Sequence, residues 1–271
     1  MAELLENHGS AVLGIAAAPF ISVIIPAHNE EKFLARTLTA LARQTYPSFE
    51  TIVVANGCSD GTEAVAQGKC DQLYSLEERS LGRARNLGAQ KARGQILLFL
   101  DADTLLPPDA LKFVARQFTR RYSTGTLKGL PDKRRIAYRL IYACKNFLHR
   151  FKLHHGSSGV ILVWRDWFLQ AGGFDENLYL RENSALMKRL RRFGKYKYIS
   201  CVPAVTSMRR YDQKGVPEMV WLWLKVWYLS NFSDLSNRTY ELMERKPRKG
   251  RNRSIRVGLG RKYEMETRPL I

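Results

Sequence analysis

The stretch Gln95–Thr104 reads QILLFLDADT and joins an apolar run to two carboxylates one residue apart. The run QILLFL predicts a strand that is buried on both faces, as in a parallel sheet. Asp101, Ala102 and Asp103 follow at its carboxyl end, where open parallel sheets bind their ligands. Carboxylate oxygens suit Mg²⁺ or Mn²⁺, which also bind diphosphate. The alternative is a turn and helix cap before Pro107, since Asp favours both.

The sequence before this stretch alternates strand and helix patterns. Ile21–Pro26 (ISVIIP) and Glu50–Ala55 (ETIVVA) are apolar runs rich in β-branched residues, which predicts two more buried strands. Glu31–Arg43 and Leu81–Arg93 predict helices. Such alternation implies βαβ units with right-handed crossovers and a parallel sheet. Shorter elements are expected at Ala64–Gln67 (helix), at Gln72–Ser75 (strand) and from Pro107 to about Phe118 (helix).

Polar clusters follow the other two long strands as well. His28–Glu30 follows Ile21–Pro26, and Asn56–Asp60 follows Glu50–Ala55. Because the carboxyl ends of parallel strands meet at one edge of a sheet, we expect both clusters to lie beside Asp101–Asp103. The sequence therefore predicts one ligand site built from three strand ends.

The second half of the chain is basic and less regular. Between Lys112 and Lys152 the sole acidic residue is Asp132. Gly125–Pro131 is expected to be a mobile loop, and Arg134–Phe151 has the periodicity of a helix. The apolar stripe of that helix comprises Ile136, Leu140, Cys144, Phe147 and Phe151. Further elements are expected at Val160–Val163 (strand), Asp166–Ala171 (helix), Ser184–Arg192 (helix) and Glu218–Phe232 (aromatic helix).

The charge of the chain restricts the classes of partner. Its 271 residues include 44 Lys and Arg against 25 Asp and Glu, which gives a formal net charge of +19. Hydrophobic residues make up 45%, which excludes a wholly disordered chain. A positive field attracts nucleic acid, anionic membrane or phosphorylated small molecules, and composition does not choose among them.

Cysteine usage and the N-terminus predict a cytosolic protein. The cysteines lie far apart and form no CxxC pair, as expected of reduced thiols. Glu3 and Glu6 stand where a secretory signal would carry basic residues. The longest apolar stretch, Met219–Phe232, contains Lys225 and is shorter than the roughly 18 apolar residues that a bilayer span requires.

Five short motifs occur along the chain. They are Ser22–Glu30 (SVIIPAHNE), Val53–Thr62 (VVANGCSDGT), Gly82–Gly88 (GRARNLG), Leu100–Thr104 (LDADT) and Gly172–Glu176 (GGFDE). Together, and in this order, they resemble glycosyltransferase family 2 over Ile21–Tyr211. The resemblance implies an α/β fold of the GT-A type, with a mostly parallel, Rossmann-like sheet flanked by helices. It also implies a nucleotide-sugar donor, a divalent metal and inversion at the anomeric carbon.

The resemblance and the composition suggest a division of the chain into segments. An N-terminal extension (1–20) precedes a glycosyltransferase domain (21–212), whose nucleotide-sugar half is about 21–108 and whose acceptor half is about 109–212. An amphipathic aromatic region (213–245) and a basic tail (246–271) form a helical, basic C-terminal extension. Because Trp and Tyr favour membrane interfaces, the aromatic region is a candidate membrane contact, with aromatic core packing as the alternative.

The resemblance assigns the contacts with the nucleotide sugar by position. They are Pro26, His28, Glu30, Asn56, Arg83, Arg85, Asp101, Ala102, Asp103, Arg209 and Arg210. Asp103 would hold the metal through the donor's diphosphate, and Asp101 would contact the metal or the ribose. Ala55 stands where the family often has an Asp. The alternative for Arg83 and Arg85 is a solvated helix face, and the alternative for Arg209 and Arg210 is an ordinary surface position.

An inverting transfer needs a base that takes the proton of the acceptor hydroxyl. The family usually places it in a Glu-Asp pair after GGFDE, where this chain has Glu182 and Asn183. Glu182 is therefore the expected base, and Asp175 is the fallback. Asp212 is a distant candidate for a third metal ligand; otherwise diphosphate and water complete the coordination. Acceptor contacts, or else a plain turn, are expected at Gly156, Ser157, Ser158 and Gly159.

The predicted function is an inverting, metal-dependent transfer of a sugar from a UDP- or GDP-linked donor to an acceptor hydroxyl. The expected partners are a lipid-linked or saccharide acceptor and an anionic membrane surface at the cytoplasmic face, with Mg²⁺ or Mn²⁺ as cofactor. A catalytically degenerate family member that binds nucleotide sugar is an alternative, because of Ala55 and Asn183. A nucleotidyltransferase is disfavoured because the loop PAHNEEK is not glycine-rich, and nucleic-acid binding because no recognition motif occurs.

Overall fold

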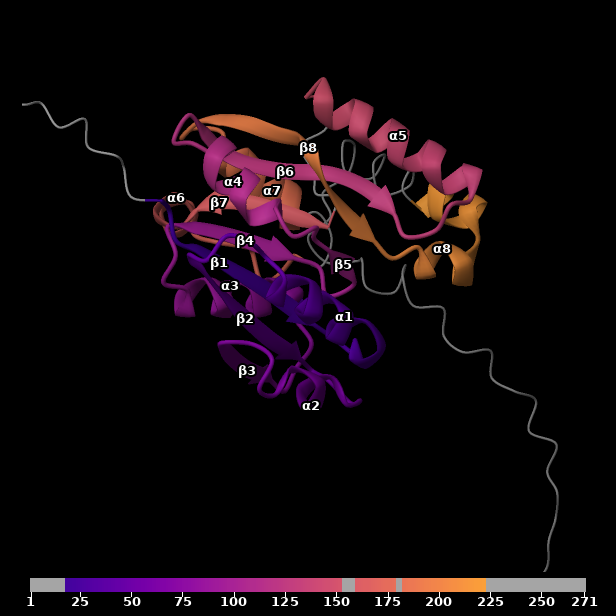
Figure 1. Ribbon diagram of the computed structural model, residues 1–271, viewed down its shortest axis with the longest axis horizontal. Coiled ribbons are helices and arrows are strands. Elements are labelled where there is room, and N and C mark those ends of the chain that lie inside the picture. Colours follow the sequence, from indigo (N-terminus) through magenta and orange to yellow (C-terminus); the bar gives the residue numbers. More distant parts are fainter. Residues whose placement is uncertain (1–17, 153–158, 179–181, 223–271) are drawn as a thin grey trace, which may run out of the picture. The chain divides into compact units, whose positions relative to one another are not determined.

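The computed structural model describes residues 18–152, 159–178 and 182–222 (Figure 1). Within these ranges the strands form one eight-stranded sheet in the order β3-β2-β1-β4-β7-β6-β8-β5. The α/β architecture expected from the sequence is confirmed. The expected extension 1–20 is described only from residue 18, the aromatic region only to residue 222, and the tail 246–271 lies outside the described residues.

The first half of the chain is a parallel sheet with helices on both faces. Its strands are β1 (Ile21–Ala27), β2 (Phe49–Asn56), β3 (Gln72–Leu76) and β4 (Ile96–Leu100). Its helices are α1 (Glu31–Ala42), α2 (Thr62–Ala66) and α3 (Leu81–Lys91). β1 lies between β2 and β4 and pairs with both in parallel.

Alternate residues of β1 face opposite cores, which explains its continuous apolar sequence. Val23 and Ile25 pack in the cluster that contains Leu34 of α1. Ile24, between them, packs in the second cluster with Ala84 of α3. Because both faces of the strand are covered, no polar alternation is present in the sequence.

The second half adds antiparallel strands to the sheet. Its strands are β5 (Thr104–Leu105), β6 (Tyr122–Pro131), β7 (Val160–Trp164) and β8 (Lys195–Thr206). Its helices are α4 (Ala110–Gln117), α5 (Ile136–Arg150), α6 (Arg165–Gln170), α7 (Glu182–Leu190) and α8 (Arg209–Lys214). β7 pairs antiparallel with β4 and β6, whereas β6 and β8 are parallel.

The expectation of a mobile loop at Gly125–Pro131 is wrong. This segment is the greater part of β6, and each residue from Gly125 to Leu127 and from Lys128 to Pro131 pairs with a residue of β8. A Cβ at Gly125 would lie 2.9 Å from the carbonyl oxygen of Lys197, so this glycine permits a close strand approach. β8 itself was not predicted, because KYKYISCVPAVT mixes basic residues, tyrosines and a proline.

The apolar stripe expected on Arg134–Phe151 exists on α5, but it faces solvent. Ile136, Leu140 and Phe147 are exposed, while Tyr138 and Tyr142 of the same helix are buried. The tyrosines pack in a cluster with residues of α8 and of the helical segment 216–222. None of the helices within the described residues is long and apolar enough to cross a bilayer.

Candidate active site

The carboxylates predicted as metal ligands lie in a tight turn between β4 and β5. The backbone N–H of Asp101 donates to the carbonyl of Gly159 at 3.0 Å, and the N–H of Thr104 donates to the carbonyl of Asp101 at 3.0 Å. The Thr37 hydroxyl of α1 donates to the carbonyl of Ala102 at 2.8 Å. These bonds hold the backbone of the motif to Gly159, to α1 and within its own turn. The Asp101 side chain is 44% exposed and that of Asp103 is 12% exposed.

An arginine from the second half of the chain closes the Asp103 side of the turn. Arg209 of α8 forms an ion pair with Glu30, and its Nε lies 3.4 Å from Asp103 Oδ2. Its guanidinium lies 4.3 Å from the ring centroid of Phe33. Burial, followed by the charge of Asp101, raises the pKa of Asp103 to about 6, against the opposing charge of Arg209. The expected alternative of an ordinary surface arginine does not describe Arg209, although Arg210 is exposed.

A second arginine lies on the Asp101 side. Arg85 of α3 is only 4% exposed, and its guanidinium lies 3.5 Å from Asp101 Oδ1 and 3.1 Å from Glu182 Oε1. It also donates to Asn183 Oδ1 at 2.8 Å and lies 5.0 Å from the ring centroid of Phe174. The buried guanidinium of Arg85 therefore joins Asp101, a candidate metal ligand, to Glu182, the expected catalytic base. It also contacts Asn183, which stands where the family usually has an Asp.

The neighbouring Arg83 differs from Arg85. Its side chain is 48% exposed and lies 3.6 Å from a carboxylate oxygen of Glu78, which is itself 86% exposed. Arg83 therefore lies on the solvated face of the helix, whereas Arg85 does not. The helix that carries both, α3, is capped at its N-terminus by Ser80, whose hydroxyl accepts a hydrogen bond from the N–H of Arg83 at 3.4 Å.

The expected nucleoside contacts lie at the ends of β1 and β2. His28 Nδ1 lies 2.7 Å from the carbonyl oxygen of Asn56, so this nitrogen carries the proton in that contact. The Asn56 side-chain oxygen accepts from the N–H of Ser80 at 2.7 Å, and Asn56 is buried. Pro26 lies in β1 opposite Val54 of β2. Asn56 therefore holds the start of α3 in place, next to the position where the nucleobase of the donor is expected.

The two candidates for the catalytic base, Glu182 and Asp175, occupy different positions. Glu182 is the first residue of α7, is buried, and reaches the Asp101 side of the turn through Arg85. Asp175 is half-buried and accepts at Oδ1 from the N–H of Asn177 at 3.0 Å. The structure joins Glu182 to the site by a chain of ion pairs, whereas the contact of Asp175 is within its own turn.

Near Gly159 and on α5 the structure places side chains that the sequence did not single out. Gly159 borders the turn, because a Cβ there would lie 2.5 Å from Thr104 Oγ1; Gly156, Ser157 and Ser158 lie outside the described residues. Burial, partly offset by the charge of Asp101, lowers the pKa of Lys145 of α5 to about 7. Tyr142, one turn earlier, hydrogen-bonds to Thr206. The sequence does contain a pattern that could have identified these residues. A polar and aromatic stripe lies on the side of α5 opposite the apolar stripe, and it comprises Tyr138, Tyr142, Lys145 and His149.

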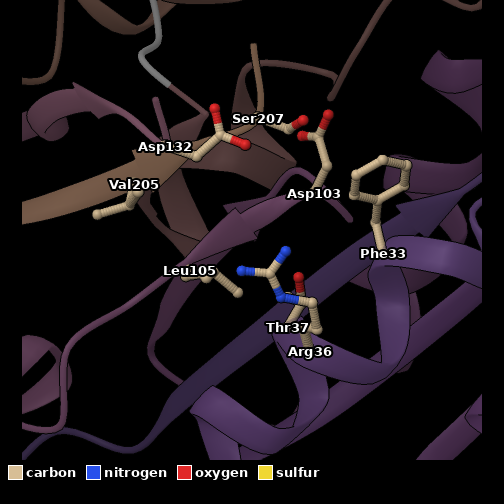
Figure 2. Close-up of a pocket in the computed structure, with 8 residues that line it drawn as sticks. All are labelled: Phe33, Arg36, Thr37, Asp103, Leu105, Asp132, Val205 and Ser207. Atoms are coloured by element: carbon tan, nitrogen blue, oxygen red, sulfur yellow. The ribbon is translucent and has the colours of Figure 1, made fainter. Parts of the chain in front are cut away.

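A pocket adjoins Asp103 on the side of α1 (Figure 2). Phe33, Arg36 and Thr37 of α1 border it, and Asp103, Asp132 and Ser207 lie across from Arg36 in this view. The N–H of Ser207 donates to the carbonyl of Asp103 at 3.2 Å. In the sequence Asp132 is only an isolated acid within a basic segment, and the structure places it at this pocket.

The residues of the turn fit a divalent cation. Asp101 and Asp103 supply hard oxygen ligands, and a bound cation would relieve the repulsion between them, which after burial is the next largest cause of the raised pKa of Asp103. Glu30 Oε2 is buried and has no hydrogen-bond partner among the described residues. Within those residues no three His, Cys, Asp or Glu side chains converge as a ligand set. Asp212 instead accepts from Lys133 at 2.5 Å.

Comparisons with known proteins place the chain among sugar-transferring enzymes. The family model described as Glycosyl transferase family 2 matches residues 22–211. Glycosyltransferase AglE of Haloferax volcanii is 40% identical over 93 residues, which cover 31% of this chain and 31% of the relative. Poly(ribitol-phosphate) beta-N-acetylglucosaminyltransferase TarS of Staphylococcus aureus is 32% identical over 110 residues, covering 38% of this chain and 19% of TarS.

Solved structures share the fold. S. aureus TarS 1-349 in complex with UDP-GlcNAc superposes with a TM-score of 0.56 at 21% identity, over 70% of this chain and 59% of that one. The mannosyltransferase PcManGT from Pyrobaculum calidifontis, in complex with GDP-Man and Mn²⁺, gives 0.57 at 19% identity, over 70% and 57%. The chain thus spans less than two thirds of each of these proteins, and the likeness confirms the GT-A fold expected from the sequence.

Proposed function

Because this chain belongs to glycosyl transferase family 2 and is a glycosyltransferase, we propose that it moves a sugar from a UDP- or GDP-linked donor to an acceptor hydroxyl with inversion. One observation carries the proposal: the two carboxylates after β4 lie between two arginines, Arg85 beside Asp101 and Arg209 beside Asp103. Carboxylates suit a cation and guanidinium groups suit phosphate, so the combination suits a metal-bound diphosphate. The UDP-GlcNAc and GDP-Man bound by relatives support the donor class.

Asp103, with Asp101, would hold Mg²⁺ or Mn²⁺, and the Mn²⁺ in PcManGT supports this assignment. The bound cation supplies positive charge that stabilises the departing diphosphate. Arg209 is held beside this position by Glu30 and Asp103, and its guanidinium would contact the same phosphates. Arg210, exposed on the same helix, adds positive charge near the leaving group.

The remaining donor contacts lie around the strand ends. Pro26, His28 and Asn56 would border the nucleoside, with the His28–Asn56 hydrogen bond keeping the imidazole in one orientation. Arg83, exposed beside this edge, would reach the phosphates from solvent. Ala102 contributes its backbone, which Thr37 holds in place.

We assign Glu182 as the base that takes the proton of the acceptor hydroxyl, with Asp175 as the alternative. The contact of Glu182 with Arg85, whose guanidinium also contacts Asp101, supports this role, because it brings the Glu182 carboxylate close to the proposed metal ligands. Binding of the donor does not require the catalytic base, so the Glu182→Gln variant should still bind the donor but should no longer transfer its sugar. Turnover that survives in Glu182→Gln and disappears in Asp175→Asn would assign the role to Asp175.

The acceptor would be a lipid-linked molecule or a polysaccharide, used at the cytoplasmic face of a membrane to which the protein attaches peripherally. The acceptor half, residues 109–212, would contribute Gly159 together with Gly156, Ser157 and Ser158. The excess of positive charge supports an anionic membrane surface as partner.

One observation favours a second candidate, a family member that binds nucleotide sugar without transferring it. Glu182 is engaged by Arg85, and the neighbouring position is the amide Asn183. Donor hydrolysis separates the two functions: with a panel of UDP- and GDP-sugars and Mn²⁺, an active enzyme releases nucleoside diphosphate slowly without acceptor. Binding of a donor with no release of its sugar, with or without acceptor extracts, would favour the second candidate.

A further inference from the structure

The outer face of α5 presents a continuous apolar stripe to solvent. Ile136 is 76% exposed, Leu140 64% and Phe147 55%, and Phe151, just after the helix, is 57% exposed. Cys144 lies between them in the same helical spacing and is exposed as well. Single exposed apolar side chains are common, but four large ones on one line mark an interaction surface.

The packing of the opposite face shows that this orientation of α5 is fixed. Tyr138 and Tyr142 are buried in a cluster with Met208 and Tyr211. Asn146 donates to the carbonyl of Gly129 at 2.8 Å and accepts from its N–H at 3.0 Å, which ties the helix to β6. Figure 1 shows α5 lying along β6 and β8, at the margin of the sheet. Rotation of the helix to bury the stripe would break these contacts.

The charge around the stripe identifies the chemistry of its partner. The segment Ile136–Arg150 contains no acidic residue. Arg139 and Arg150 follow Ile136 and Phe147 by three residues, so they flank the stripe on one side, and both are exposed. An apolar line bordered by arginines matches the boundary between acyl chains and anionic headgroups.

We propose that α5 docks on an anionic lipid bilayer, with its axis in the plane of the interface and its stripe among the acyl chains. The aromatic region 213–245, a candidate membrane contact in the sequence, is described only to residue 222, and α5 is a separate surface within residues 21–212. The opposite side of α5 carries Tyr142 and Lys145, which face the carboxylates of the candidate active site. Docking would therefore hold this side of the site against the membrane. The inference rests on the proposed function, because it assigns to α5 the membrane attachment proposed there.

The test is co-sedimentation of the full-length protein with phosphatidylcholine vesicles, with and without phosphatidylglycerol. We expect binding to the anionic vesicles, and a loss of about threefold to tenfold in apparent affinity for Leu140→Ser, because one buried apolar side chain is removed. Leu169→Ser on α6 is the matched control, since Leu169 is 47% exposed outside the stripe, and it should bind as the wild type does. Equal binding by Leu140→Ser, Ile136→Ser/Leu140→Ser/Phe147→Ser and the wild type would overturn the proposal.

The two exposed cysteines allow a direct readout of what covers the stripe. An environment-sensitive fluorophore is attached to Cys144 in a Cys58→Ser/Cys70→Ser/Cys201→Ser background, or to Cys201 with Cys144→Ser instead. We expect the emission of the Cys144 label to shift to the blue only when anionic vesicles are added, and that of the Cys201 label not to shift. A Cys144 label that is shielded before vesicles are added would mean that a second copy, or another segment of this chain, covers the stripe.

Either outcome is independent of the proposed reaction. Nucleotide binding, measured by calorimetry on the same variants, should be unchanged, because none of the substituted stripe residues contacts the carboxylates or their arginines. Loss of vesicle binding with intact nucleotide binding supports the docking surface, whereas retained vesicle binding contradicts it whatever the enzymatic result.

Discussion

Two arginines divide the carboxylates of the site between them. Arg85 contacts Asp101 and Glu182, and Arg209 contacts Asp103 and Glu30. The first arginine belongs to α3, and the second is separated from Glu30 by 179 residues. At the level of single residues, the site is therefore a pair of ion-pair networks that meet at one turn.

Substitution of Arg209 tests whether its guanidinium competes with a metal. Arg209→Gln removes a positive charge beside Asp103 and Glu30, so these carboxylates should attract Mn²⁺ more strongly. We expect the affinity of the nucleotide-free protein for Mn²⁺ to rise roughly threefold to tenfold, measured by titration of the free ion's electron paramagnetic resonance signal. The exposed neighbour gives the control, Arg210→Gln, which should change affinity less. Weaker Mn²⁺ binding by Arg209→Gln would show that the arginine does not occupy the cation's position.

Arg85 and Arg83 form a natural pair for a stability measurement. Arg85→Met leaves two partly buried carboxylates without their counter-ion, which should lower the free energy of unfolding by about 3–5 kcal/mol. Arg83→Met removes an exposed pair, for which we expect a change of less than about 1 kcal/mol. Urea denaturation of both variants measures the difference. Similar losses in the two variants would contradict the central position of Arg85.

Some of these residues were identifiable from sequence and others were not. Asp101 and Asp103 follow a continuous apolar strand, and this position at a strand end is enough to make them candidate ligands. The separate environments of Arg83 and Arg85 depend on which side of α3 packs inward, and the sequence left that open. Lys145 was not recognised, because its approach to Asp101 depends on how α5 packs across β6.

At the scale of elements, continuous apolar sequence predicted the strands that are buried on both faces. β1, β2 and β4 were placed correctly to within about a residue, because burial on both faces leaves a continuous signal. β6 and β8 were missed, because they pair with one another through glycines, basic residues and a proline, so neither carries that signal alone. The stripe on α5 was found, but its exposure follows from tertiary packing.

The contact between α3 and β1 depends on a glycine. A Cβ at Gly88 would lie 2.4 Å from Ile24 Cγ2, so Gly88→Ala should lower stability by about 1–3 kcal/mol, although alanine is the better helix former. The double variant Gly88→Ala/Ile24→Ala removes Cγ2 from this contact, and it should be more stable than the sum of the two single variants predicts. Thermal unfolding of the four proteins gives the coupling energy. Additive effects would mean that the helix moves away from the strand instead.

The net charge of +19 has different meanings in different parts of the molecule. Near the turn after β4 the arginines are paired with carboxylates, so this region adds little to the net charge. Along α5 it consists of exposed arginines beside apolar side chains, with no acidic residue in the helix. Composition alone was equally consistent with nucleic acid, membrane or phosphorylated ligands, and the positions of these charges favour the last two.

A buried carboxylate links several elements of the sheet and makes the stability of the molecule pH-dependent. Glu50 is 1% exposed and accepts from Ser22 at 2.6 Å, from Gln72 at 2.9 Å and from Arg93. Burial would raise its pKa, but these hydrogen bonds outweigh burial and lower the pKa below its ordinary value of 4.5.

Glu50→Gln should therefore lower the free energy of unfolding by about 2–3 kcal/mol at pH 7. Because the folded-state pKa is the lower one, the wild-type advantage is complete above about pH 4.5 and is lost as the pH falls through the folded value. Urea denaturation at pH 7 and below pH 4 measures this change. An advantage that persists in acid would show that the network does not depend on the charge of Glu50.

The measurement that tests the central claim most directly is calorimetric titration of the protein with UDP and with GDP, in the presence and absence of Mn²⁺. The account predicts that one of the nucleotides binds more tightly with Mn²⁺, that Asp103→Ala abolishes the metal-dependent part, and that Asp166→Ala, a surface substitution on α6, retains it. Tight nucleotide binding that neither the metal nor Asp103→Ala affects would contradict the assignment of the donor site to the turn after β4.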